Sequence, residues 1–232
     1  MKKLIDMSDT WYNRLRPVIE SDKFKELATF IAEEKKTKTI YPSRENIFKA
    51  FNSTPFEEVR VVLLGQDPYP TEFKGEPVAC GLAFAPNNPE FKPPSLRIIY
   101  NNLKDTVYKD RLTFPDDLDM RTWADQGVLL LNIGLTVVKS KAGSHIKQWE
   151  FFTEAVINTL NDSAGLIFIM WGKEAQKYKH LIDETKHYIL EAAHPASSIY
   201  SGQPWKCDHF SKVNYYLSLN HNEEIHWLKN LD

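Results

Sequence analysis

The sequence predicts an α/β fold: a single domain with a central, mostly parallel four-stranded β-sheet flanked by helices on both faces. Three observations lead to this prediction: the length of the chain, four short apolar runs, and helical patterns that alternate with those runs. A length of 232 residues suits one large or two small domains. The sequence contains no internal repeat, low-complexity tract or Ser/Gly-rich linker. We therefore expect residues 1–232 to form one domain.

Four apolar runs predict the strands of the sheet. They are Val59–Leu64, Gly127–Leu131, Gly165–Met170 and Tyr188–Leu190, the last of which runs on to Ala193. Each run is short and continuously apolar, whereas a half-exposed strand would alternate between apolar and polar residues. Continuous runs of this kind are typical of strands buried on both faces, as in a parallel sheet.

Four segments show helical patterns: 93–108, 148–161, 173–184 and 211–219. The first segment opens with prolines and carries Leu96, Ile99, Leu103 and Val107 at spacings of three or four. The second segment has an apolar face that comprises Trp149, Phe152, Val156, Ile157 and Leu160. Because predicted strands and helices alternate, the connections favour a parallel sheet.

Composition excludes some classes of protein. The chain is 42% hydrophobic and 12% aromatic, which makes a single substantial core feasible. No apolar run approaches the ~18 residues of a membrane span, and no apolar segment follows the two N-terminal lysines. We therefore expect a cytoplasmic protein without a signal peptide. Cys80 and Cys207 lack CxxC spacing and are predicted to be reduced structural thiols. A net charge of -2 argues against a broadly basic nucleic-acid coat, although it permits a local contact surface.

Polar residues follow each of the four predicted strands. The endings are Gly65-Gln66-Asp67, Asn132, Trp171-Gly172-Lys173 and His194-Pro195. In an open α/β sheet, ligands bind outside the carboxyl ends of the strands. We therefore expect all four endings to converge on one crevice.

Each candidate residue also has a purely structural interpretation. Asp67 before a proline is a common turn former, and Asn132 can cap the end of a strand. His194 can be a satisfied loop histidine, and Tyr69 and Phe84 can be ordinary core aromatics. The occurrence of all five near one end of the sheet favours a functional site.

Several motifs resemble those of family 1 uracil-DNA glycosylases, in the order of that family and over residues 11–227. The segment GQDPYP (65–70) resembles the water-activating loop of the family, and CGLAF (80–84) resembles the segment with the base-stacking phenylalanine. WADQGVLLLN (123–132) resembles the strand that ends in the uracil-reading asparagine. The remaining matches are PPSL (93–96), LTV (135–137), WE (149–150), WGKEAQ (171–176) and HP…HF (194–210).

The resemblance implies a monofunctional DNA glycosylase that flips uracil out of DNA, hydrolyses its N-glycosidic bond and leaves an abasic site, opening base-excision repair. The transition state resembles a sugar cation with negative charge growing on the departing uracil. Asp67 would stabilise the cation and position water, and a neutral His194 would donate to uracil O2. The backbone N–H of Gln66 would be a second donor. No cofactor is expected, since the sequence lacks HExxH and paired CxxC spacing for a metal.

The resemblance also implies how uracil is selected. The Asn132 amide would accept from uracil N3–H and donate to O4, a pattern that cytosine reverses. Tyr69 would occupy the space of the thymine methyl group, and Phe84 would stack on the flipped base.

The same resemblance assigns DNA contacts to three segments. The first is the proline-rich loop with Pro93, Pro94 and Ser95. The second is Gly172-Lys173, where a Gly-Ser pair is common in the family. A lysine there can strengthen phosphate contact or simply be a solvated residue at a helix start, and the sequence leaves both open.

The third segment departs from the family pattern. Many members have HPSPLS, with a leucine wedge that fills the gap left by the flipped base. Gap-free alignment places Ala196 at a phosphate-contacting serine, with Ser197 beside it, and Ser198 at the wedge. Serine is a poor wedge, and Ile199 or Tyr200 can insert in its place. Weak wedging predicts a preference for single-stranded over duplex substrate.

Three other readings remain open at the level of sequence: an accessory binding protein on a glycosylase fold, a glycosylase for another damaged base, and an unrelated nucleotide-binding α/β enzyme. The last lacks GxGxxG and GxxxxGK[ST] motifs. The expected partners are uracil-containing single- or double-stranded DNA and, through the resemblance, a DNA-mimicking inhibitor protein. We expect no membrane partner and a monomer.

Overall fold

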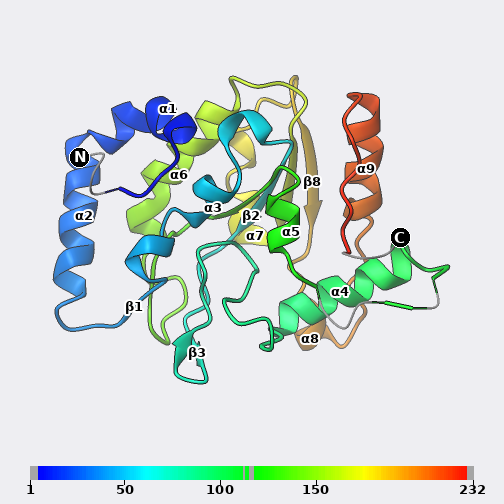
Figure 1. The fold of residues 1–232 in the computed structure, drawn as a ribbon, viewed down its shortest axis with the longest axis horizontal. Coiled ribbons are helices and arrows are strands. Elements are labelled where there is room, and N and C mark those ends of the chain that lie inside the picture. Colours follow the sequence, from blue (N-terminus) through cyan, green and yellow to red (C-terminus); the bar gives the residue numbers. More distant parts are fainter. Residues whose placement is uncertain (1–4, 112, 115–117, 229–232) are drawn as a thin grey trace.

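The computed structural model describes residues 5–111, 113–114 and 118–228. Its central sheet has four parallel strands in the order β5-β2-β7-β8 (Figure 1). Their bounds are β2 Val61–Gly65, β5 Val128–Asn132, β7 Ile167–Trp171 and β8 Tyr188–Ala192. The predicted strands are thus confirmed to within two residues, and every pairing in this sheet is parallel.

Burial explains why these strands could be predicted. Every residue of β2, β5 and β7 is buried, since helices cover both faces of the sheet. β8 lies at an edge and is partly exposed, with Glu191 facing solvent. Its apolar run is accordingly the shortest of the four.

Two small antiparallel pairs lie outside the central sheet and were not expected from the sequence. β1 (Ile40–Tyr41) pairs with β6 (Val137–Val138). β3 (Glu72–Phe73) pairs with β4 (Glu76–Pro77) in a hairpin directly after the loop that follows β2.

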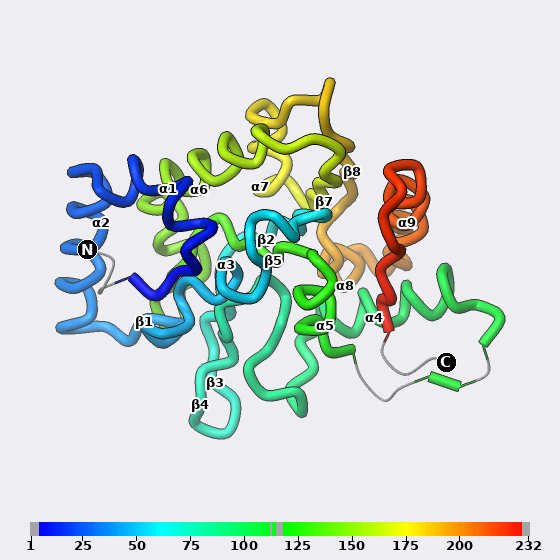
Figure 2. Tube along the Cα trace, turned by 45° about the horizontal axis from the view of Figure 1, so that its top comes forward, coloured from blue at the N-terminus to red at the C-terminus, as the bar shows by residue number. Residues whose placement is uncertain are grey.

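Helices lie on both faces of the sheet, as predicted. Figures 1 and 2 show α1, α2 and α6 gathered on one side, with α4 and α9 on the other. The α-helices are α1 Asp9–Ile19, α2 Asp22–Glu34, α3 Lys49–Ser53, α4 Pro94–Thr106, α5 Arg121–Ala124, α6 Ile146–Leu160, α7 Lys173–Gln176, α8 Ser197–Ser201 and α9 His209–Leu219. Short 3-10 helices span Arg44–Asn46, Phe56–Glu58 and Lys179–Leu181. Helices α4, α6 and α9 confirm three of the four predicted helical segments.

The prediction of a helix over residues 173–184 is wrong in its extent. The α-helical part ends at Gln176, and a separate 3-10 turn follows at Lys179–Leu181. The Asn161 side chain, at the end of α6, donates to the Leu181 carbonyl at 2.7 Å and accepts from the Asp183 N–H at 3.1 Å. These long-range bonds hold the backbone groups of residues 181–183 in a non-helical path.

The N-terminal helices α1 and α2 form a further layer, which was not expected from the sequence. α1 buries Trp11, Leu15 and Ile19 along one stripe, at the spacing of an amphipathic helix. α2 begins after Ser21, whose side chain accepts from the Phe24 N–H at 3.2 Å. The spacing of the apolar residues in α1 and the N-cap serine before α2 can both be recognised in the sequence.

Cys80 and Cys207 are buried free thiols, as predicted. Within the described ranges, no helix combines the length and apolar character needed to cross a membrane.

Candidate active site

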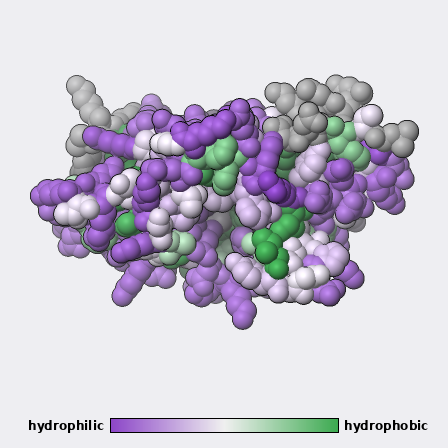
Figure 3. All heavy atoms as spheres, turned by 90° about the horizontal axis from the view of Figure 1, so that it is seen from below, coloured by the Kyte–Doolittle hydropathy of each residue, from purple (hydrophilic) through white to green (hydrophobic). Residues whose placement is uncertain are grey.

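A cavity of about 200 Å³ lies where the sheet strands end. Its lining consists of Gly65, Gln66, Asp67, Pro68, Tyr69, Pro70, Phe84, Ser95, Asn132 and His194. The carboxyl ends of the strands point toward the lower face in Figure 1, near the β3–β4 hairpin and α8. Figure 3 views that face, where hydrophobic residues occupy small areas of a mostly hydrophilic surface. The structure therefore brings together six pocket residues predicted from the sequence: Gln66, Asp67, Tyr69, Phe84, Asn132 and His194.

Three of the four strand endings line the cavity directly. The expectation that all four would do so is wrong for β7, because Gly172 and Lys173 are not part of the lining. The end of β7 supports the cavity from behind. Trp171 packs edge-on against the Phe84 ring with centroids 5.6 Å apart.

Gly65 makes room for the Asn132 amide. The two residues lie opposite each other in the register of β2 and β5. A Cβ atom on Gly65 would lie 2.6 Å from Asn132 Oδ1 and 2.9 Å from Ala83 Cβ, so any other residue would displace them. Asn132 is only 4% exposed. Its amide is therefore a fixed polar group in a poorly solvated wall, where hydrogen bonds to a ligand are strong.

Two hydrogen bonds orient the Asp67 carboxylate. Oδ2 accepts from the Gly143 backbone N–H at 2.5 Å, and Oδ1 accepts from Gln66 Nε2 at 3.0 Å. Burial raises the pKa of Asp67 above its ordinary value, and the two hydrogen bonds act in the opposite direction. Pro68 and Pro70 flank this segment and restrict its backbone. A carboxylate held in this way can position a water molecule or stabilise a positive charge.

The structure fixes the protonation of His194. Its Nδ1 accepts a hydrogen bond from the Ala196 N–H at 3.1 Å, which requires that Nδ1 carry no proton. Burial lowers the pKa of His194. The imidazole is therefore neutral near pH 7 and carries its proton on Nε2, as a hydrogen-bond donor.

Gly172 is required beside His194. Its φ of +90° is unfavourable for residues with side chains, and an added Cβ would lie 2.9 Å from His194 Cβ. The glycine predicted as a DNA contact thus has a structural role in admitting the imidazole.

A hydrogen bond connects Tyr69 to the backbone of Phe84. Phe84 has a φ of +62°, a conformation that costs ~1–3 kcal/mol for a residue with a side chain. The Tyr69 hydroxyl donates to the Phe84 carbonyl at 2.9 Å, and the Phe84 ring stacks on His194 with centroids 5.6 Å apart. The strained backbone therefore presents the aromatic ring to the cavity beside the imidazole.

The ring of Tyr69 is also fixed by hydrophobic contacts. It packs against a small cluster of Tyr41, Ala79 and Val137 that joins β1 and β6. Burial raises the pKa of Tyr69, so the phenol stays neutral at physiological pH. Ser95, at the start of α4, lies 3.4 Å from the Tyr69 hydroxyl.

The predicted DNA-contact residues lie in different environments around the cavity. Pro93 is buried, Pro94 is exposed and begins α4, and Ser95 is buried in the cavity wall. Lys173 is exposed at the start of α7.

The loop that departs from the family pattern forms helix α8. The Ser198 hydroxyl donates to the Pro195 carbonyl at 3.0 Å, so this side chain turns back onto its own loop. Ser197 is half-buried. Ile199 is 52% exposed and Tyr200 is 89% exposed, which makes them the apolar side chains that α8 presents to solvent.

Two parts of the site, the Gly143 N–H and Trp171, were not predicted from the sequence. Gly143 acts through its backbone N–H, and a glycine has no functional group that could have indicated this role in the sequence. For Trp171 the sequence indicates only a place at the end of a strand.

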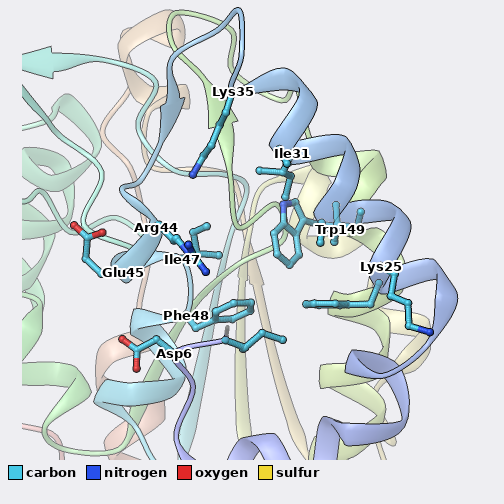
Figure 4. A pocket seen from close by; sticks show the side chains of 14 residues that line it. Asp6, Lys25, Ile31, Lys35, Arg44, Glu45, Ile47, Phe48 and Trp149 are labelled. Carbon is cyan, nitrogen blue, oxygen red and sulfur yellow. The ribbon is translucent and has the colours of Figure 1, made fainter. Parts of the chain in front are cut away.

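A larger cavity of about 960 Å³ lies between α2, α6 and the segment 44–48. Figure 4 shows the rings of Phe48 and Trp149 directed into it, with Lys25, Lys35 and Arg44 around them. Its inner walls are mainly aliphatic and aromatic, and His194, Asn132 and Asp67 lie elsewhere. The combination of carboxylate, imidazole and amide singles out the smaller cavity as the candidate active site.

Among the described residues, no group of three or more His, Cys, Asp or Glu side chains is arranged to hold a metal ion.

A parallel α/β sheet whose strand ends hold a carboxylate, a neutral imidazole, an amide and an aromatic ring around a small cavity defines an enzyme that acts on a planar heterocycle. The sequence model of the Uracil DNA glycosylase superfamily matches residues 51–218. The chain belongs to this superfamily.

Individual relatives agree with this assignment. The uracil-DNA glycosylase of Clostridioides difficile (strain 630) is 40% identical over 226 residues, which cover 97% of this chain and 98% of the relative. That of Aliivibrio fischeri is 45% identical over 192 residues, covering 82% and 83%. The crystal structure of mimivirus uracil-DNA glycosylase superposes with a TM-score of 0.86 at 31% identity, covering 97% of this chain and 88% of the other. A variant of mimivirus UNG in complex with UGI superposes equally well, with a TM-score of 0.86.

Proposed function

We propose that this chain is a uracil-DNA glycosylase, which hydrolyses the bond between uracil and deoxyribose in DNA and leaves an abasic site. The observation that carries the proposal is one cavity lined by Asp67, Asn132 and His194 in a member of this superfamily. The volume of about 200 Å³ lies below the range of ~300–1,000 Å³ typical of drug-sized ligands, and it suits a single flipped base. The motifs GQDPYP (65–70) and HP (194–195) support placement in family 1.

Bond cleavage separates charge, and groups on two sides of the cavity stabilise the positive charge on the sugar and the negative charge on uracil. As the C1′–N1 bond breaks, its electron pair leaves with uracil and the sugar becomes cation-like. Asp67 stabilises the cation and orients the water that adds to C1′. This water loses a proton as the C1′–O bond forms, and the uracil anion takes up a proton, so the overall reaction is a hydrolysis. The hydrogen bonds from Gly143 and Gln66 fix the direction of the carboxylate before substrate arrives.

The departing uracil needs hydrogen-bond donors at O2. His194 Nε2–H is one donor, since Nδ1 is occupied by the Ala196 N–H. The backbone N–H of Gln66 is the second. Such preorganised donors act where negative charge develops, and removing one typically costs ~10²–10³-fold in kcat.

Base selection resides in Asn132, Tyr69 and Phe84. The Asn132 amide accepts from N3–H and donates to O4 of uracil. Phe84 stacks on the base, which is worth ~1–3 kcal/mol in single-strand binders. Tyr69 blocks the position of the thymine methyl group.

The activity is tested by alkaline strand scission of an oligonucleotide that contains one uracil. We expect cleavage by the wild-type chain on single-stranded and duplex DNA, and equal cleavage with EDTA. Absence of cleavage by folded protein would contradict the proposal. Binding without turnover would then favour an accessory binding protein, and release of a different base would favour a glycosylase for another lesion.

Replacing Tyr69 by alanine is expected to admit thymine. A single methylene group in an apolar pocket is worth ~10–200-fold in specificity, so thymine release should rise by a comparable factor. Tyr69→Phe is the matched control, because it loses the hydroxyl bond to Phe84 but keeps the ring that fills the methyl position. Both variants are assayed on oligonucleotides with one thymine or one uracil. Uracil release without thymine release by Tyr69→Ala would contradict this role of Tyr69.

The DNA surface in this proposal surrounds the cavity. It comprises Pro93, Pro94 and Ser95 at the start of α4, Gly172 and Lys173 before α7, and Ser197, Ser198, Ile199 and Tyr200 in α8. Tyr200 is the proposed wedge, supported by its 89% exposure and by the inward turn of Ser198.

The proposed wedge has a measurable consequence. We expect faster uracil release from single-stranded than from U·G duplex DNA, and Tyr200→Ala should widen this ratio by ~10-fold, because unstacking the duplex costs a few kcal/mol. Tyr215→Ala, at another exposed tyrosine on α9, serves as the control. An unchanged ratio in Tyr200→Ala would count against insertion of Tyr200, and comparable wild-type rates on both substrates would count against weak wedging.

The proposal includes the expected surroundings of the enzyme. The partners are uracil-containing single- or double-stranded DNA and a DNA-mimicking inhibitor of the UGI kind, the latter supported by the mimivirus UNG complex. We also propose that the protein is a cytoplasmic monomer and that the whole chain forms one domain. A hydrophobic cluster that includes both Trp11 and Trp227 supports the single domain.

A further inference from the structure

The Asp67 carboxylate is held by a second loop, far away in the sequence. This loop comprises residues 139–145, between β6 and α6, and is called the clamp loop below. It touches the loop after β2 at two points. The Gly143 N–H donates to Asp67 Oδ2 at 2.5 Å, and the Ser140 N–H donates to the Pro70 carbonyl at 2.7 Å.

The clamp loop is itself fixed by hydrogen bonds. The Ser144 hydroxyl accepts from the Val138 N–H at 2.8 Å, and the Lys141 N–H donates to the Val138 carbonyl at 2.9 Å. Gly143 has a φ of +77°, so the loop places this residue in a conformation that favours glycine. The direction of the Gly143 N–H is therefore set by the path of the loop.

A buried histidine anchors the far end of the clamp loop. His145 is 1% exposed, and its Nδ1 lies 2.8 Å from the Thr136 hydroxyl, which also accepts from Trp149 Nε1 at 2.7 Å. Its Nε2 lies 3.8 Å from a carboxylate oxygen of Glu34. His145 thus connects the residue before β6, helix α6 and helix α2, two residues beyond Gly143.

We propose that the clamp loop is a positioning element for catalysis, in which the backbone N–H of Gly143 orients the Asp67 carboxylate toward the sugar and the attacking water. The inference rests on the proposed function, because it assigns this task in the same reaction. With Oδ2 taken by the Gly143 N–H and Oδ1 by Gln66 Nε2, both oxygens of the carboxylate are hydrogen-bonded and its plane is fixed. Gly143 is not part of the cavity lining, so in this proposal it acts through Asp67.

The proposal predicts a shift of the acidic limb of the pH–rate profile. A hydrogen bond to the charged form lowers the pKa of a carboxyl group, so misdirecting the Gly143 N–H raises the pKa of Asp67. Activity that requires the carboxylate is then lost at a higher pH. The other titratable groups lining the cavity are Tyr69 and His194, and Lys139 of the clamp loop pairs with Glu72 at 2.6 Å. None of these groups changes in the variants below.

Two glycines allow a matched test. Gly143→Ala places a Cβ no closer than 3.7 Å to Ile146 Cδ1, so its effect is backbone strain at a φ of +77°. Gly75→Ala imposes the same strain at a φ of +83°, at the exposed tip of the β3–β4 hairpin, where no atom lies within 4 Å of the new Cβ. Ser144→Ala loosens the clamp loop without left-handed strain.

We expect kcat of Gly143→Ala to fall by ~10–100-fold, since misplacement of a catalytic group by about 1 Å costs that order. KM should stay within about twofold of the wild-type value. The midpoint of the acidic limb of the pH–rate profile should move to a higher pH by roughly half a unit or more. Ser144→Ala should show the same changes at smaller size, and Gly75→Ala should match wild type. The proposal would be overturned if Gly143→Ala and Ser144→Ala both kept the kcat and the acidic limb of wild type. It would also be overturned if Gly75→Ala lost as much activity as Gly143→Ala.

A second measurement separates this proposal from the proposed function. The pKa of Asp67 is followed by ¹³C NMR of its carboxyl group in wild type and in Gly143→Ala, without substrate. A higher pKa of Asp67 in the variant supports the role of the clamp loop even if wild type fails to release uracil. Failure of wild type to release uracil would contradict the proposed function alone. An unchanged pKa in folded Gly143→Ala overturns the clamp while leaving uracil release untouched.

Discussion

Replacing Asp67 by asparagine is expected to reduce uracil release by at least ~100-fold. The amide has nearly the same shape as the carboxylate, but it carries no charge to stabilise the cation-like sugar and is a poor partner for the attacking water. The Gly143 N–H can still donate to the amide oxygen, so the loop should keep its path. The measurement is alkaline strand scission on a single-uracil oligonucleotide under single-turnover conditions, with wild type as reference.

A stability measurement serves as the control for this variant. Burial raises the pKa of Asp67 above its ordinary value of 3.8, so the folded protein binds the proton more tightly than the unfolded chain does. The contribution of Asp67 to stability therefore falls as the pH rises from 3.8 through the raised pKa. Asp67→Asn removes this unfavourable charge and should be at least as stable as wild type at pH 7. A lower Tm together with lost activity would point to misfolding, and near-wild-type activity would remove Asp67 from catalysis.

The second large effect is a change of base specificity in Asn132→Asp. A site built to pair with one hydrogen-bond pattern rejects the opposite pattern by ~10⁴ or more, so wild type should ignore cytosine. Burial at a position that is 4% exposed favours the protonated form of a carboxyl group there. A protonated carboxyl group donates to cytosine N3 and accepts from the N4 amine. We expect the preference for uracil over cytosine to fall by ~100-fold or more.

Asn132→Ala is the matched control for this change. It removes the amide without supplying the reversed pattern, so it should weaken uracil release and gain no cytosine release. Because cytosine pairing needs the protonated carboxyl group, cytosine release by Asn132→Asp, divided by uracil release by wild type at the same pH, should increase as the pH falls. A folded Asn132→Asp that releases no cytosine on a single-cytosine oligonucleotide would show that Asn132 does not read the base.

The candidate site could be predicted to a large extent because its side chains carry chemical signals at strand ends. Asp67 and Asn132 follow continuous apolar runs, and those runs are readable because β2 and β5 are buried on both faces. His194 follows the shorter apolar run of the edge strand β8. Parallel strands bring their carboxyl ends to one edge of the sheet, so residues far apart in the chain were expected to meet. The structure places these three side chains around one cavity.

Predictions failed where long-range contacts override a local pattern. The segment 173–184 has the composition of one helix, yet the Asn161 side chain binds the backbone at Leu181 and Asp183 and interrupts it. Lys173 follows a strand like the other endings but stays outside the cavity lining. Its neighbour Gly172 is needed because its φ is +90° and a Cβ atom there would lie 2.9 Å from His194 Cβ.

The sequence by itself determined the class of fold, the four strands and the chemical identities of the groups at their ends. Tertiary structure alone decided how those groups are oriented: the Gly143 N–H on Asp67, the Ala196 N–H on His194 Nδ1, and the left-handed backbone of Phe84. Every residue except proline has a backbone N–H, so a backbone donor leaves no mark in the sequence. Its direction depends on the path of the chain, which is fixed only when distant segments pack together.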